Sequence, residues 1–187
     1  ALGNTGADNW EQRTYLPLDD KAHWYADGEE HYLPDDFYSS KYFIDKTIEF
    51  IDSNHGDGKP FFASVGFQAV HIPIQAPEEF VEKYHDTYQQ GWQVLREQRR
   101  ERAAELGLIP EDAPVVTMST SKQRNDLSTA DKQYNARQMA VYAGMLDAMD
   151  HHVGRLVAHL KSIGEYDNTL FIFVSDNGAE PSDPMAV

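Results

Sequence analysis

The stretch Thr169–Glu180, TLFIFVSDNGAE, joins a continuous apolar run to an acidic turn. The run 170–174 contains no polar residue, which is typical of a central strand buried on both faces of a sheet. Asp176 and Asn177 follow within three residues, so a carboxylate and an amide oxygen are expected together at the carboxyl end of that strand. Open α/β sheets bind their ligands at this edge. The stretch therefore predicts a strand followed by a site for a hard cation.

A second apolar run, FFASVGF, follows Lys59-Pro60 and predicts another short buried strand over residues 60–67. Pro73 and Pro77 exclude regular strand pairing in the next segment and favour an extended loop before a helix that begins near Glu78. His71 stands at the head of this loop. A single histidine beside prolines is more often structural than catalytic, so its spacing alone assigns no role.

Two helices are expected to precede the two strands. Ser39 or Ser40 can cap the first helix, and the SNHGDG cluster at 53–58 ends it. The second helix has a capping-box-like start at Ser128 and Asp131 and ends at Gly164. Its expected buried stripe is Tyr134, Met139, Tyr142, Leu146, Met149, Val153, Leu156 and Leu160.

Glycines interrupt this second helix. Gly144 and Gly154 can bend it or let another backbone approach closely. His151 and His152 also lie on it, but neighbouring helix positions point in different directions, so a surface or packing role is favoured over a joint metal site.

The remaining segments predict peripheral structure. Asp27-Gly28 favours a type I′ turn in a small hairpin. Residues 1–22 predict an irregular N-terminal segment, 88–106 a solvated charged helix, and 107–127 a long surface loop. Helices alternating with apolar strands indicate one partial α/β domain over residues 1–187, with three layers and a mostly parallel sheet flanked by helices.

The composition excludes several classes of partner. Thirty-one acidic residues against 16 lysines and arginines give a net charge of −15, which argues against nucleic-acid binding. No cysteine is present, so a disulfide framework and a thiolate nucleophile are excluded for these residues. No apolar run is long enough to span a bilayer, so no membrane partner is expected.

Two blocks of sequence resemble the sulfatase family, arylsulfatases in particular. They are VGFQAVHIPIQAPEEF at 65–80 and VYAGMLDAMDHHVGRLVAHLKSIGEYDNTLFIFVSDNGAE at 141–180, and their order and spacing both fit. The resemblance implies a fragment of an alkaline-phosphatase-like domain that hydrolyses small sulfate esters with a formylglycine nucleophile.

Carried over to this chain, the resemblance implies that Asp176 and Asn177 are metal ligands and that His71 is catalytic, contacting the sulfate group near the leaving oxygen. Carboxylate and amide oxygens suit Ca²⁺, and Mg²⁺ less well in this family. The family's phosphatases tend to carry histidine after the aspartate, so Asn177 favours a sulfatase.

Other parts of the family pattern cannot be placed here. Ser182-Asp183-Pro184 begins like the Cys/Ser-x-Pro-x-Arg nucleophile motif, yet Ala186 stands where arginine is needed. The acidic pairs Asp19-Asp20 and Asp35-Asp36 do not follow apolar strands, so they are expected in solvated loops. The chain is therefore expected to be a central segment without turnover when isolated, with the formylglycine outside it.

Alternatives stay open at this point. The same residues could belong to a non-catalytic or recruited binding module, or to a phosphoesterase of the same superfamily. Uncovered strand edges in a partial domain also predict self-association.

Overall fold

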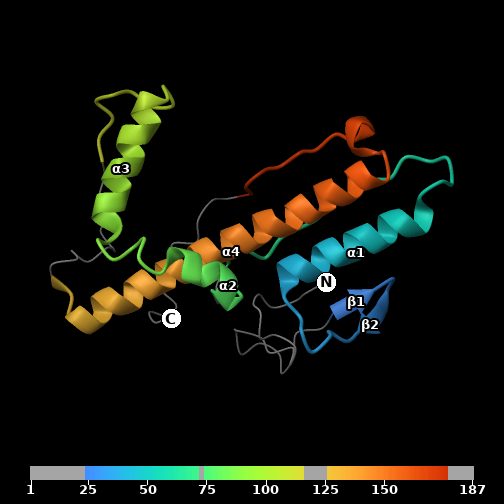
Figure 1. Cartoon of the computed structure of the whole chain (residues 1–187), viewed down its shortest axis with the longest axis horizontal. Helices are drawn as coiled ribbons and strands as arrows, with labels where there is room; N and C mark the ends of the chain where they lie inside the picture. The colour runs from blue at the N-terminus through green and yellow to red at the C-terminus, as the bar shows by residue number, and fades with distance from the viewer. Residues whose placement is uncertain (1–23, 72–73, 116–125, 177–187) are drawn as a thin grey trace.

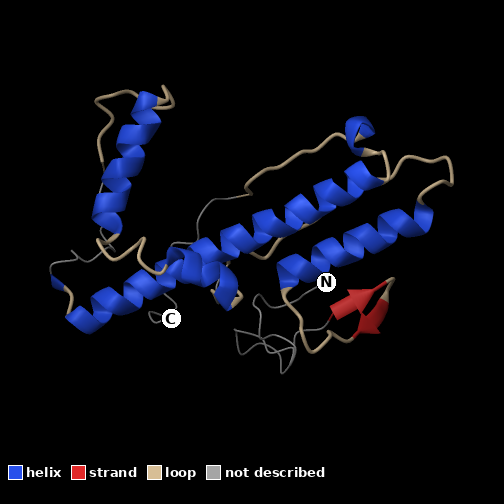
Figure 2. Ribbon diagram, in the orientation of Figure 1, coloured by secondary structure: helices blue, strands red, loops and turns tan. Residues whose placement is uncertain are grey.

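A computed structural model describes residues 24–71, 74–115 and 126–176 of the chain (Figure 1). Among these residues helices dominate, and the strands form one small hairpin (Figure 2). The elements in chain order are β1 Trp24–Ala26, β2 Glu29–His31, α1 Ser39–Asn54, α2 Glu78–Val81, the 3-10 helix η2 Glu82–Tyr84, α3 Trp92–Glu105, α4 Thr129–Ser162 and the 3-10 helix η4 Tyr166–Asn168.

The predicted hairpin is confirmed. Strands β1 and β2 pair antiparallel with Trp24 opposite His31, and both turn residues have positive φ, 53° at Asp27 and 86° at Gly28. Such angles match the type I′ geometry that Asp-Gly favours. Trp24 is buried and meets the Phe37 ring edge-on at 5.2 Å, which attaches the hairpin to the start of α1.

Helix α1 forms as predicted, but its cap differs. Tyr38 is the N-cap residue and makes no side-chain capping bond, whereas Ser39 and Ser40 lie inside the helix and are buried. The predicted serine cap is therefore wrong, because the helix begins at Ser39 and both serines are buried within its first turn. The buried apolar side chains of the helix are Ile44 and Ile51.

Helix α4 is the longest element, and both of its predicted ends are confirmed. The Ser128 hydroxyl accepts a hydrogen bond from the Asp131 backbone N–H at 3.1 Å. At the other end Gly164 has a φ of 78°, and the Glu165 N–H donates to the Leu160 carbonyl at 2.9 Å. This bond, which reaches back past the last turn, is typical of a glycine-terminated helix.

The buried face of α4 is not the predicted stripe of large residues. Of that stripe only Leu160 is buried, whereas Tyr134 and Leu146 are exposed. The face that packs inward consists mainly of small residues: Ala136, Ala140, Ala143, Gly144, Met145, Ala148, His152 and Leu160. Small side chains occupy this face because α1 and α2 both pack against α4, which leaves little room between the helix backbones.

Helices α1 and α4 lie side by side and run in the same direction. Arg155 of α4 donates a hydrogen bond to Asp45 of α1 at 2.7 Å. One turn further along α4, the His159 ring lies 2.8 Å from Asp52, which is later in α1 than Asp45. From the first contact to the second, the residue number rises in both helices, so the two helices run parallel, as Figure 1 shows. A parallel pair of helices, each followed by an extended segment, is the connectivity of α/β folds.

The two predicted strands are extended but do not pair in a sheet within the described residues. Residues 60–67 and 169–175 carry no strand pairing, and their apolar side chains are exposed, with Phe62 at 93% and Leu170 at 85%. The prediction that these runs are buried on both faces is therefore wrong for this structure. A strand is buried only when neighbouring strands accept its backbone hydrogen bonds, and the described residues offer no such neighbour.

The charged helix is peripheral, as predicted. Helix α3 has no buried residue, and the described part of the following loop, 107–115, is mostly exposed. The predicted N-terminal segment 1–22 and residues 116–125 of the loop lie outside the described residues. None of the described helices, the long α4 included, is apolar enough over a sufficient length to cross a bilayer.

The two glycines of α4 give a matched test of this packing. A Cβ at Gly144 would lie 3.1 Å from the Val81 backbone nitrogen, whereas one at Gly154 would meet nothing within 4 Å. Gly144→Ala should lower the free energy of unfolding by about 1–3 kcal/mol through overpacking. Gly154→Ala should raise it by about 0.5–1 kcal/mol through helix propensity. Urea unfolding followed by circular dichroism measures both, and equal gains would contradict the close approach of α2 and α4.

Candidate functional site

His71 lies at the end of the extended segment that returns from α1. Its backbone N–H donates to the Gln68 carbonyl at 2.8 Å, which closes a tight turn, and its side chain is exposed. The chain then reaches Pro77, the N-cap residue of α2. The predicted helix start at Glu78 is confirmed, although α2 has only four residues before the backbone tightens into η2.

Asp176 lies at the end of the other extended segment, which leaves α4 through η4 and runs back alongside that helix (Figure 1). Its side chain is exposed. Asn177, the second predicted ligand, lies outside the described residues. The two candidate groups that the structure describes, His71 and Asp176, therefore each follow an extended segment that returns along the paired helices.

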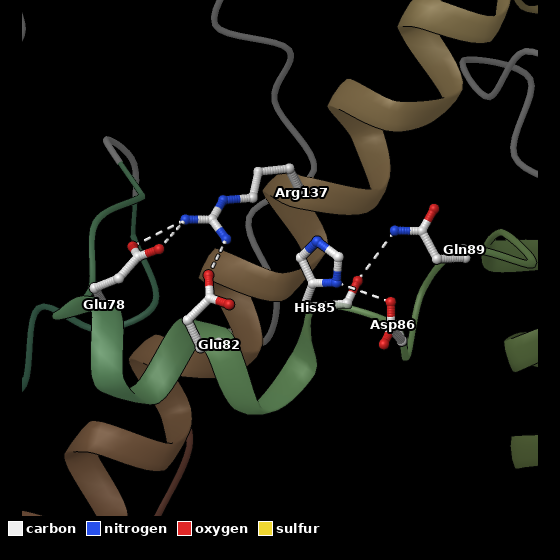
Figure 3. A network of polar contacts seen from close by, with 6 residues as sticks. All are labelled: Glu78, Glu82, His85, Asp86, Gln89 and Arg137. Atoms are coloured by element: carbon white, nitrogen blue, oxygen red, sulfur yellow. Dashed lines mark hydrogen bonds and ion pairs between the residues drawn. The ribbon is translucent and has the colours of Figure 1, made fainter.

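Helix α2 is attached to α4 by ionic contacts that hold the segment after His71. Figure 3 shows Arg137 of α4 reaching Glu78 of α2 and Glu82 of the adjoining η2, with its Nη2 2.7 Å from Glu78 Oε1 and its Nη1 3.0 Å from Glu82 Oε1. Lys83 Nζ lies 2.8 Å from Asp147 Oδ2. The groups around Arg137 are exposed, so these ion pairs contribute little to the free energy of unfolding and mainly fix the orientation of α2.

Apolar packing completes the attachment of α2. Val81 is 1% exposed and lies against Ala140 and Ala143, while the Phe80 ring packs near Ala148. No spacing in the sequence marks Arg137 as the partner of Glu78, since the two residues are far apart in the chain.

The predicted metal ligands can be tested against the chemistry of calcium. Asp176 supplies one carboxylate, and an asparagine at 177 supplies an amide oxygen, both hard ligands that suit the ion. Calcium takes about six to eight oxygens, and in the described residues no three His, Asp or Glu side chains gather into a metal cluster. The pair therefore suits calcium in the kind of its oxygens, and by itself it would be only part of a calcium coordination shell.

Comparison with known proteins places these motifs in a family. The sequence profile of the sulfatase family matches residues 3–185, nearly the whole chain. The chain belongs to the sulfatase family. An α/β fold of the alkaline-phosphatase type follows for this sulfatase segment from that membership, as its sequence predicted.

Individual relatives agree with the family match. An uncharacterized sulfatase of Schizosaccharomyces pombe is 45% identical over 82% of this chain and 28% of its own length. An arylsulfatase of Klebsiella aerogenes is 37% identical over 86% of this chain and 34% of its own length. A multifunctional alkaline phosphatase superfamily protein of Trinickia caryophylli is 27% identical over 81% of the chain and 29% of its own length. The sulfatase segment thus spans about a third or less of these relatives.

A buried polar cluster between α1 and α4 lies apart from the candidate site. His152 is 7% exposed, packs against the Tyr38 and Phe80 rings, and lies with its Nδ1 3.2 Å from Arg155 Nη1. Burial, helped by the nearby positive charge of Arg155, lowers the pKa of His152 to about 4. The packing role predicted for this histidine is confirmed.

Asp45 is the carboxylate of this cluster, and its pKa is lowered although burial acts to raise it. Burial alone would raise the pKa of Asp45, but hydrogen bonds from Arg155 and Lys41 outweigh it and lower the pKa below its ordinary value. The guanidinium of Arg155 therefore has its negative partner beside it, while the neighbouring imidazole stays neutral.

The histidine predicts a specific pH dependence of stability. As the pH is lowered below about 6.5, the imidazole becomes protonated in the unfolded chain but stays neutral in the folded chain until about pH 4. The free energy of unfolding should therefore decrease as the pH is lowered from 6.5 to 4. One such proton gives a slope of at most about 1.4 kcal/mol per pH unit. Urea unfolding between pH 4.5 and 7 should show a flatter slope for His152→Gln than for the unchanged chain. The exposed His151→Gln is the control, and an equal slope in both variants would contradict the assignment.

Proposed function

We propose that this chain is the part of a sulfate ester hydrolase that supplies two calcium ligands and one catalytic histidine. The observation that carries the proposal is the pair of motifs around His71 and Asp176, which stand in the order of the family and each follow an extended segment returning along α1 and α4. The arylsulfatase relative supports an aryl or similar small sulfate ester as substrate.

The proposed roles follow from the chemistry of each side chain. Asp176 and Asn177 would hold Ca²⁺, with Mg²⁺ as the weaker candidate, and the bound ion would neutralise charge on the sulfuryl oxygens. An imidazole can donate one hydrogen bond and accept another, so His71 can hold a sulfate oxygen and serve the leaving oxygen. Both described side chains are exposed, which supports access by a substrate.

The proposal assigns the nucleophile and the wider sheet to residues outside this chain. The sequence has no cysteine and no complete Cys/Ser-x-Pro-x-Arg motif, so formylglycine has no precursor position here. In the proposed three-layer, mostly parallel sheet, the segments 60–67 and 169–175 are strands with further strands beside them. Such neighbours would bury the apolar side chains that are exposed in this structure.

A phosphoesterase of the same superfamily is the second candidate. The alkaline phosphatase superfamily relative favours it, whereas Asn177 favours the sulfatase, because a histidine there would suit zinc or manganese better. A non-catalytic binding module is the third. An upstream Cys/Ser-x-Pro-x-Arg motif in the same coding sequence would support an enzyme, and a genuine start and stop around these residues would support the module.

The roles can be tested in the complete protein that carries this segment. With a chromogenic aryl sulfate, His71→Ala should lower kcat/KM by about 10²–10⁴-fold, the range of general acid–base contributions. Asp176→Ala should do likewise and should weaken calcium binding measured by calorimetry. His85→Ala and Asp167→Ala, exposed residues of the same kinds, are the controls. Unchanged turnover in either test variant would refute that residue's role, and faster turnover of the matching phosphate ester would favour the second candidate.

The 187-residue chain alone should bind calcium weakly and show no turnover. It offers too few oxygen ligands and no nucleophile, so the histidine has no reaction to assist. Measurable hydrolysis of the aryl sulfate by the purified chain, abolished by His71→Ala, would overturn the assignment of the nucleophile to another part of the protein.

A further inference from the structure

The connection between His71 and α2 is short. Six residues separate His71 from Glu78, and two of them are prolines, whose rings restrict the backbone angle φ. On the N-terminal side, His71 closes a turn with Gln68, whose carbonyl accepts its backbone N–H at 2.8 Å. On the other side, Ala76 packs against the apolar core around Val81. A shift of α2 on α4 would therefore move the segment that carries His71.

Helix α2 depends on α4 for its position. It has four residues and no side-chain capping bond, whereas an isolated helix needs about 12–15 residues to form in water. One contact with α4 is apolar, because the Val81 backbone lies close against Gly144. That contact is near the end of α2 and is made by backbone and methyl groups, which leaves the start of the helix to be held by polar groups.

Arg137 is the α4 residue that contacts the start of α2. Its Nη2 donates to both carboxylate oxygens of Glu78, at 2.7 and 2.9 Å, and its Nη1 donates to Glu82 at 3.0 Å (Figure 3). Glu78 is the first residue of α2 and directly follows the N-cap Pro77. Hydrogen bonding to Glu78, and next to Glu82, raises the pKa of Arg137. A guanidinium that binds two carboxylates fixes direction as well as distance, because its N–H donors lie in one plane.

We propose that Arg137 is a positioning residue for His71, which it reaches through Glu78 and the short connection before it. This role rests on the proposed function, because it concerns the place of the His71 imidazole in sulfate ester hydrolysis. The side chains of Arg137 and Glu78 are 42% and 66% exposed, and exposed ion pairs add little to stability. A displacement of about 1 Å at a catalytic group, in contrast, can lower the rate by about 10²-fold. The ion pair should therefore matter for turnover and hardly for unfolding.

The role of Arg137 is tested in the complete protein with a chromogenic aryl sulfate. Arg137→Met, which removes the guanidinium and keeps an unbranched apolar stem, should lower kcat about 10–10²-fold. Calcium affinity and the urea midpoint should stay close to those of the unchanged protein. Arg102→Met is the matched control, because it removes an exposed arginine that pairs with Glu105 on α3 and should leave kcat unchanged. An unchanged kcat in Arg137→Met, or a loss that comes with weaker calcium binding or a lower urea midpoint, would overturn the proposal.

The two carboxylates provide a second test of the same contact. Glu78→Gln should reproduce most of the loss in kcat and Glu82→Gln less of it, because Glu78 accepts two of the three hydrogen bonds and is nearer to His71 in the chain. Arg137→Met combined with Glu78→Gln should be no slower than Arg137→Met alone, since the two side chains act as one pair. Equal effects of the two glutamine variants, or losses that add in the combined variant, would count against Glu78 as the link.

A protein without the histidine separates this role from the proposed function. In the His71→Ala background, Arg137→Met should cause no further loss of kcat, because the imidazole through which it acts is missing. A further loss would show that Arg137 acts by another route and would overturn the proposal. Full turnover of His71→Ala by itself would refute the catalytic role of His71 and this positioning role with it. An unchanged kcat for Arg137→Met in a protein that needs His71 would refute the positioning role alone.

Discussion

The close approach of α2 to the small-residue face of α4 is the contact on which the described structure depends. Gly144 lets the Val81 backbone come within 3.1 Å of where a Cβ would stand, and Ala140 and Ala148 continue the same flat surface. Such a face gains little from the area of any one side chain, but it lets many backbone atoms pack at van der Waals distance. Helix α1 contacts the C-terminal half of α4, around His152 and Arg155, so α4 packs against both α1 and α2.

Local rules explain what could be predicted from the sequence. Asp27-Gly28, the Ser128 cap and the stop at Gly164 each depend on a few neighbouring residues, and all three occur as expected. The buried face of α4 could not be found by searching for large apolar residues, because the tertiary contact selects alanine and glycine. The prediction of buried strands at 60–67 and 169–175 was wrong for a different reason. An apolar run forms a buried strand only when partner strands complete the sheet.

The candidate site shows the same division between chemistry and geometry. His71 and Asp176 could be proposed from the sequence, because they stand in two short motifs inside the region that the family profile matches, and their roles stay predictions. Their supports were not, since Arg137 joins Glu78 across a long separation in sequence and reveals itself only in the folded chain. The same holds for the polar cluster around His152. The imidazole stays neutral because it is buried between α1 and α4, and no spacing in the sequence predicts that burial.

The lack of any buried residue in α3 has a consequence for how this sulfatase segment can vary. The helix lies between Gly91 and Gly107, both at positive φ, and its partly buried Leu95 packs against the apolar core around Val81 and Ala140. Its amides should exchange with solvent at a low energetic cost compared with those of α4. Insertions, deletions or fused tags between the two glycines should be tolerated far better than changes of the same size anywhere along the central helix.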